Sequence, residues 1–147
     1  MKTELAIPSD LKFLAVVEDW LLSSLKAELG TAIGLDWQKV EGRLRLVIVE
    51  VYSNIVRHAH HDRPDIPVVL RLGLEGSFLS LEVWDEGHGF DIRTYRAPNP
   101  SNPQEGGYGW LILHQLMDRV DYLLSVGDGR NCLTLEKDLG LAAEFSI

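Results

Sequence analysis

The sequence predicts an α+β fold: a two-layer sandwich with helices on one face of a mixed, mostly antiparallel sheet. Three observations support this prediction. Two long N-terminal segments carry apolar residues at helical spacing, two pairs of alternating strand patterns follow, and one more helical pattern separates the pairs. Because helices and strands are grouped along the chain rather than strictly alternating, layers are favoured over a parallel, doubly wound sheet.

The first helix has clear signals at both ends. Residues 4–7 alternate weakly and can form a short edge strand that ends at Pro8, after which Ser9 or Asp10 can cap the helix. Gly30 is suited to its C-terminal end. The apolar positions of this helix recur at helical spacing: Leu11, Leu14, Val17, Leu21, Leu22 and Leu25.

The second helix is expected from about Asp36 to about His58, and its inward-facing residues are Val40, Leu44, Val47, Val51 and Ile55. A third helix is expected to begin near Trp110 and to carry Leu111, Leu113, Leu116 and Met117. The strand pairs are 68–74 with 78–85, joined through Glu75-Gly76, and 120–126 with 131–137, joined through Gly127-Asp128-Gly129.

Length and composition indicate one globular domain over residues 1–147. The net charge of −8 argues against a general nucleic-acid binder, for which a basic stripe is expected. The single cysteine, Cys132, cannot form an internal disulfide, which favours a reduced, cytoplasmic compartment. No apolar run approaches the roughly 18 residues of a membrane span, and the N-terminus lacks a signal-peptide pattern.

Glu50, Asn54 and His58 are spaced by four residues on the second helix, so they are expected to form one polar ridge beside its apolar face. A carboxylate at Glu50 could accept a proton from a hydroxyl group or orient a water molecule. The amide oxygen of Asn54 could complete a magnesium shell that already contains phosphate oxygens and waters. The simpler interpretation is a solvated face of an amphipathic helix.

Asp85 ends a strand and is followed by Gly87 and Gly89. On its strand, Asp85 shares a face with apolar residues, so its carboxylate should lie at the rim of the core and could accept a hydrogen bond from an exocyclic amine such as adenine N6. The two glycines allow a sharp turn and a close approach to a flat ring. An ordinary loop would have the same composition.

A glycine-rich turn, 106–109, precedes the third helix, and the free N–H groups of such a helix start favour a phosphate. It matches neither a P-loop nor a dinucleotide-binding fingerprint. The long, proline-rich segment before it is typical of an active-site lid. Arg93 and Arg96 in this segment could reach phosphates, although each could equally be a solvated loop charge.

The order of these motifs resembles that of the GHKL ATPases, which include gyrase, Hsp90, histidine kinases and MutL. The short lid and the stretch 107–120, GYGWLILHQLMDRV, are similar to the anti-sigma-factor serine kinases of bacteria. The resemblance covers about residues 9–138 and implies a Bergerat-type ATP-binding fold with an ATP lid at about 90–106. It implies ATP and Mg²⁺ as ligands, a STAS-domain anti-sigma-factor antagonist and a sigma factor as partners, and a homodimer.

The resemblance also implies roles for individual residues. Glu50 would be the catalytic base that activates a serine of the antagonist, and Asn54 would be the magnesium ligand. Asp85 would bind the adenine amine. The remaining expected nucleotide-binding residues are His58, Gly87, Gly89, Arg93, Arg96, Gly107, Gly109 and Asn131.

Two positions depart from the family pattern. Several of these kinases have an arginine just before the glycine-rich turn, where this chain has Gln104 and Glu105 before residues 106–109. The last strand often begins with Gly-Thr in the family, whereas here it begins with Arg130-Asn131. Loss of the arginine would weaken the stabilisation of charge on the transferring phosphoryl group unless Arg93 or Arg96 replaces it. A partner-binding switch that holds ATP but hardly turns it over is therefore an alternative to the kinase.

Two further alternatives have less support. His58, His60, His61 and Asp62 could be read as a metal site, but ligands this crowded at a helix end rarely converge, and a solvated helix terminus is the expected state. A stand-alone histidine-kinase catalytic domain is compatible with the fold. However, no upstream dimerisation helix with a phospho-acceptor histidine is recognisable in the sequence.

Overall fold

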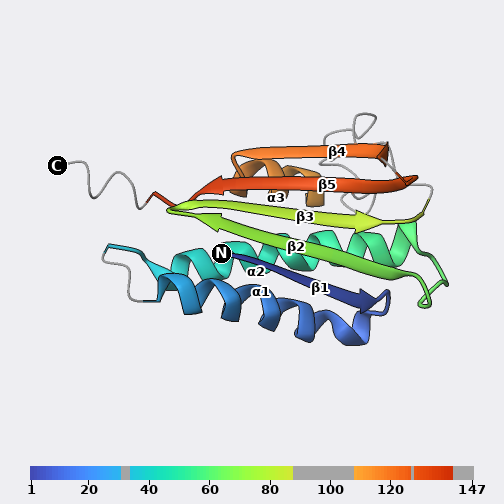
Figure 1. Ribbon diagram of the computed structural model, residues 1–147, viewed down its shortest axis with the longest axis horizontal. Coiled ribbons are helices and arrows are strands. Elements are labelled where there is room, and N and C mark those ends of the chain that lie inside the picture. The colour runs from blue at the N-terminus through green and yellow to red at the C-terminus, as the bar shows by residue number, and fades with distance from the viewer. Residues whose placement is uncertain (31–33, 88–107, 127, 141–147) are drawn as a thin grey trace, which may run out of the picture.

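The protein is described from a computed structural model, in which residues 1–30, 34–87, 108–126 and 128–140 are placed. These residues form a two-layer α+β sandwich, as expected: the helices lie together behind a single open sheet (Figure 1). The elements follow the order β1, α1, α2, β2, β3, α3, β4, β5, with short irregular turns of helix before α1 and after α2.

The sheet has five strands in the order β1-β2-β3-β5-β4, and every pairing among the described residues is antiparallel. The strands are β1 (Lys2–Pro8), β2 (Pro67–Glu75), β3 (Phe78–Asp85), β4 (Arg119–Val126) and β5 (Arg130–Asp138). The predicted edge strand exists and is longer than expected. Gly76, with φ +57, makes the tight turn between β2 and β3, a conformation that favours glycine.

The first helical segment begins at a predicted capping residue, and the second begins near the position expected for it. Asp10 accepts a hydrogen bond from the Lys12 N–H at the start of a 3₁₀ turn (Leu11–Phe13) that leads into α1 (Leu14–Leu29). Asp36 accepts one from the Lys39 N–H, 3.2 Å away, at the start of α2 (Trp37–Asn54). The third helix, α3, spans Tyr108–Leu116.

The core lies between the helices and one face of the sheet. The alternate residues predicted for β3, from Leu79 to Asp85, are buried, and the matching residues of β2 and β5 face the same layer. Tyr52 of α2 is fully buried, and its hydroxyl donates to the Pro8 carbonyl oxygen and accepts from the Asp10 N–H. This contact fixes the end of β1 against the second helix.

The second helix does not remain α-helical as far as predicted. A π-helical turn, Ile55–Ala59, follows α2, and the His60 N–H donates to the Ile55 carbonyl oxygen, 2.8 Å away and five residues earlier. The four-residue spacing that aligns Glu50 with Asn54 is therefore not continued by α-helix to His58. Such turns occur often at functional sites, and this one lies at the end of the sandwich that carries the predicted motifs.

Candidate functional site

The carboxylate of Glu50 is held by its neighbour one turn along α2. The Asn54 Nδ2 donates to Glu50 Oε1 at 2.9 Å, and both side chains are half-buried. Because the amide nitrogen faces the carboxylate, the amide oxygen of Asn54 is the atom that remains for a cation. Glu50 and Asn54 are thus neighbours in space, as their spacing predicts.

The first turn of α3 packs directly on Glu50. A side-chain Cβ placed on Gly109 would overlap the Oε1 and Cδ atoms of Glu50, so the observed position of this carboxylate requires glycine. The first N–H groups of a helix have no partner within the helix and attract anions. A phosphate bound at this helix start would therefore lie next to the carboxylate of Glu50.

Asp85 is only 1% exposed, yet its carboxylate is well supplied with donors. Oδ1 accepts from the Asn131 Nδ2 at 2.7 Å and from the Gly87 N–H at 3.2 Å, while Oδ2 accepts from the Tyr122 hydroxyl at 2.9 Å. A carboxylate has about four acceptor positions, and donors among the described residues fill about three, which leaves about one on Oδ2. This atom is suited to accept a further N–H from a bound amine.

Asn131 lies directly opposite Asp85 in the register of β3 and β5, and it is 2% exposed. Besides Asp85, its Nδ2 donates to the Gly87 carbonyl oxygen at 2.9 Å, and its Oδ1 accepts from the Ser125 N–H at 3.1 Å. Ser125 lies at the irregularity of β4, with φ +54. Asn131 therefore fixes the turn after Asp85 from within the protein.

The second motif, which is the stretch Asp85-Glu86-Gly87, also contacts the end of the second helix. A Cβ on Gly87 would overlap the carbonyl oxygen, carbonyl carbon and Cα of Ala59, the last residue of the π turn. Backbone packs on backbone here, which only glycine permits. The second helix with its π turn therefore contacts two other segments, α3 at Glu50 and the turn after Asp85 at Ala59.

Several predicted site residues lie outside the described residues: Gly89, Arg93, Arg96 and Gly107, with Gln104 and Glu105. Their roles remain predictions. His58 lies in the π turn with an exposed side chain.

The interpretation of the histidine cluster as a solvated helix terminus is wrong for His60, which is 1% exposed. Its two ring nitrogens contact the Ser9 hydroxyl and the Glu86 N–H. Within the described ranges no group of three or more His, Cys, Asp or Glu side chains is arranged to hold a metal ion. Helical periodicity places His60 on the solvent side, so no local pattern predicts its burial. Nor does any local pattern connect Ser9 with His60 or Tyr122 with Asp85.

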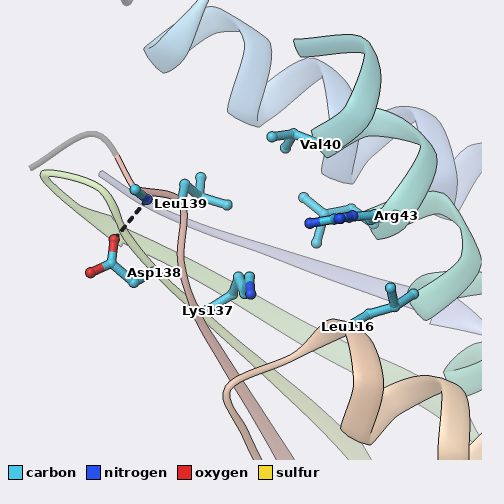
Figure 2. A pocket seen from close by; sticks show the side chains of 8 residues that line it. Val40, Arg43, Leu116, Lys137, Asp138 and Leu139 are labelled. Atoms are coloured by element: carbon cyan, nitrogen blue, oxygen red, sulfur yellow. Dashed lines mark hydrogen bonds between the residues drawn. The ribbon is translucent and has the colours of Figure 1, made fainter. Parts of the chain in front are cut away.

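Two hollows of the described surface lie away from these motifs. One, of about 180 Å³, lies between the start of α2, the end of α3 and the end of β5, where Arg43 extends from α2 toward the strand (Figure 2). The other, of about 680 Å³, lies on the face of the sheet that the helices leave uncovered, over β1, β2 and β3. No helix among the placed residues is long and apolar enough to cross a membrane.

An open antiparallel sheet covered on one face by helices, with Asn and Glu on one helix and a buried Asp at a strand end, defines an ATPase-type domain of the kind found in histidine kinases. The profile of the histidine kinase-like ATPase domain matches residues 11–137, and the chain belongs to this family. Its relatives include proteins named serine-protein kinase and anti-sigma F factor, the class that the motif order resembles.

Two relatives and one solved structure illustrate the similarity. The chain is 26% identical over 125 residues to serine-protein kinase RsbW of Bacillus velezensis, covering 80% of this chain and 74% of the relative. It is 27% identical over 84 residues to anti-sigma F factor of Oceanobacillus iheyensis, covering 54% and 58%. The blue-light-activated histidine kinase of Erythrobacter litoralis superposes with a TM-score of 0.51 at 25% identity, covering 73% of this chain.

The chain spans only part of several of these proteins. It covers 33% of the Erythrobacter histidine kinase, and 60% of a further relative, the RsbW of Oceanobacillus iheyensis. The similarity therefore concerns the ATPase domain.

Proposed function

We propose that this chain binds ATP with Mg²⁺ and transfers the γ-phosphate to a serine of a STAS-type anti-sigma-factor antagonist, thereby controlling the availability of a sigma factor. The observation that carries the proposal is the contact between Gly109 and Glu50, because an anion bound at this helix start would lie against the carboxylate. The names of the relatives, serine-protein kinase and anti-sigma F factor, support the choice of substrate and partner.

The proposed chemistry assigns one task to each group. Glu50 accepts the proton of the serine hydroxyl while the serine oxygen bonds to the γ-phosphorus of ATP. The bond between the γ-phosphorus and the β–γ bridging oxygen breaks, and ADP is released. The Asn54 amide oxygen is a hard donor of the type that Mg²⁺ takes beside phosphate oxygens and waters. When bound, Mg²⁺ would neutralise charge on the phosphates.

Asp85 would select the base. Its remaining acceptor position on Oδ2 would take the exocyclic amine of adenine, which guanine lacks at that ring position. The turn at Gly87 would leave the backbone close to the ring. His58 and the residues of the predicted lid would complete the nucleotide site.

The kinase proposal is tested by incubating the protein with labelled ATP, Mg²⁺ and a STAS-domain antagonist. Label on a serine of the antagonist is expected with the wild-type protein. With Glu50→Gln we expect transfer to be lost while ATP still binds, because the amide keeps the shape but cannot accept the proton. If the wild-type protein binds ATP and labels no serine, the alternative of a switch that acts by binding alone is the better description; the Gln104-Glu105 pair favours that alternative.

We also propose that the chain forms a homodimer through the uncovered face of the sheet. Gly73 and Ser80 oppose each other in the register, so the middle of this face carries little side-chain volume, and Phe78 beside them is 44% exposed. An exposed aromatic side chain beside a hollow suits a two-fold interface, in which Phe78 of each copy enters the hollow of the other copy. Sedimentation should give a dimer for the wild-type protein and a monomer for Phe78→Glu. If both proteins sediment as monomers, this interface is excluded.

A further inference from the structure

His60 connects three segments that are distant in the sequence. It follows the π turn and is 1% exposed. Its Nδ1 lies 2.6 Å from the hydroxyl of Ser9, at the end of β1, and that hydroxyl lies 2.6 Å from the Ile66 carbonyl oxygen, just before β2. Its Nε2 lies 2.8 Å from the backbone nitrogen of Glu86.

These contacts determine which ring nitrogen carries the proton. The Ile66 carbonyl oxygen can only accept, so the single hydroxyl hydrogen of Ser9 is donated to it, and Ser9 Oγ accepts from His60 Nδ1–H. The Glu86 N–H can only donate, so Nε2 must be unprotonated. His60 is therefore a neutral imidazole with its proton on Nδ1. A second proton, on Nε2, would face the Glu86 N–H, which is also a donor.

The surroundings favour the same neutral form. Burial lowers the pKa of His60, and Arg63 lowers it further, against the opposing effects of the nearby carboxylates of Asp85, Glu86 and Asp65.

The hydrogen bond to Glu86 lies at the centre of the second motif. Glu86 separates Asp85 from Gly87, whose N–H donates to Asp85 Oδ1 and whose backbone packs on Ala59. Since Ala59 and His60 are consecutive, the Ala59 backbone supports Gly87 while the next side chain, His60, accepts the Glu86 N–H. A change at His60 should therefore be transmitted to the carboxylate of Asp85 through a single peptide unit.

We propose that His60 is a positioning residue for nucleotide binding, which holds the Asp85–Glu86 peptide so that Asp85 can receive the base. This inference rests on the proposed function, in which Asp85 accepts the adenine amine. No contact between His60 and the nucleotide is required. The role needs an acceptor at the place of Nε2, and the contact with Ser9 serves to keep that nitrogen unprotonated.

Two substitutions separate the two sides of the ring. His60→Gln places its amide oxygen the same number of bonds from Cα as Nε2, so it can still accept from the Glu86 N–H. His60→Asn places its amide at the position of Nδ1, so it can reach Ser9 but not Glu86. Each buries one amide, which makes the pair matched in polarity.

The test measures ATP affinity by titration calorimetry, with folding checked by circular dichroism. We expect His60→Asn to weaken ATP binding about tenfold, the equivalent of one lost hydrogen bond at the upper end of its usual range, and His60→Gln to weaken it less than about threefold. Equal affinities for the two variants would overturn the inference. If the wild-type protein binds no ATP, the proposed function fails and the inference fails with it.

A pH profile provides a readout that a purely structural role would not change, and it decides the case if His60→Asn does not fold. As pH falls through the lowered pKa of His60, the affinity of the wild type for ATP should decrease more steeply than that of His60→Gln. Titration of ATP itself affects both proteins equally. Parallel profiles would contradict the inference, as would ¹⁵N spectra that show the proton on Nε2 in the nucleotide-free protein.

Discussion

Replacing Gly109 with alanine tests whether the approach of α3 to Glu50 serves the site or the fold. The added Cβ would overlap the Oε1 and Cδ atoms of Glu50 and lie 2.7 Å from its Cγ. All three belong to a flexible side chain, so the carboxylate can rotate away while the backbone stays in place. This movement breaks the 2.9 Å hydrogen bond from Asn54.

The expected magnitudes follow from these contacts. Alanine favours a helix by up to about 1 kcal/mol over glycine, and the lost hydrogen bond costs about 0.5–1.5 kcal/mol, so the two effects nearly cancel. The melting temperature should change by less than about 4 °C, since 1 kcal/mol corresponds to roughly 2–4 °C in a domain of this size. A displaced general base should reduce phosphoryl transfer by about a hundredfold or more.

Gly87→Ala is the matched comparison, because its Cβ would overlap only backbone atoms of Ala59. Backbone cannot rotate away, so this variant should lose about 1–3 kcal/mol of stability. Gly42→Ala, where nothing lies within 4 Å, should be stabilised by about 0.5–1 kcal/mol. Calorimetric melting and the labelled-ATP assay measure both effects. Wild-type transfer by Gly109→Ala, or a wild-type melting temperature for Gly87→Ala, would refute the reasoning.

Three further predictions concern the buried polar groups. Asn131→Ala removes a donor to Asp85 and should weaken ATP binding about tenfold in titration calorimetry. Unchanged affinity would show that Asn131 does not contribute to nucleotide binding. Tyr52→Phe leaves the Asp10 N–H and Pro8 oxygen without this partner and should cost about 1–2 kcal/mol in urea unfolding while ATP affinity stays constant. Because the pKa of His60 is lowered on folding, the unfolded chain binds its proton first. Stability should therefore decrease as pH falls from about 6.5 toward the lowered pKa, by up to about 1.4 kcal/mol per pH unit, and His60→Gln should lack this component.

Most of the fold could be predicted from local patterns. The alternation in β2 and β3, the cap at Asp10, and the turn at Gly76 are each specified by a few neighbouring residues, and the structure confirms them. The order of the strands in the sheet was not predicted, because the pairing of β3 with β5 joins residues about 50 positions apart and leaves no local pattern.

The site was predictable only where its residues share one element. Glu50 and Asn54 lie one helical turn apart, and their contact follows from that spacing. Two of the donors to Asp85 come from β4 and β5, and no spacing connects Tyr122 or Asn131 with it. The same holds for Gly109, whose need for glycine arises from a side chain 59 positions earlier in the sequence.

His60 shows how a small irregularity changes which residues are buried. In a continuous α-helix, five steps of about 100° would place His60 about 140° away from the inward-facing Ile55, toward solvent. The π turn accommodates one extra residue, which subtracts about one step and leaves His60 about 40° from Ile55, facing the core. The same change directs the Ala59 carbonyl toward Gly87. A single irregular turn thus places both the backbone that supports the second motif and the imidazole that holds it, so an insertion or deletion within Ile55–Ala59 should disturb Asp85 while leaving Glu50 on its α-helical turn.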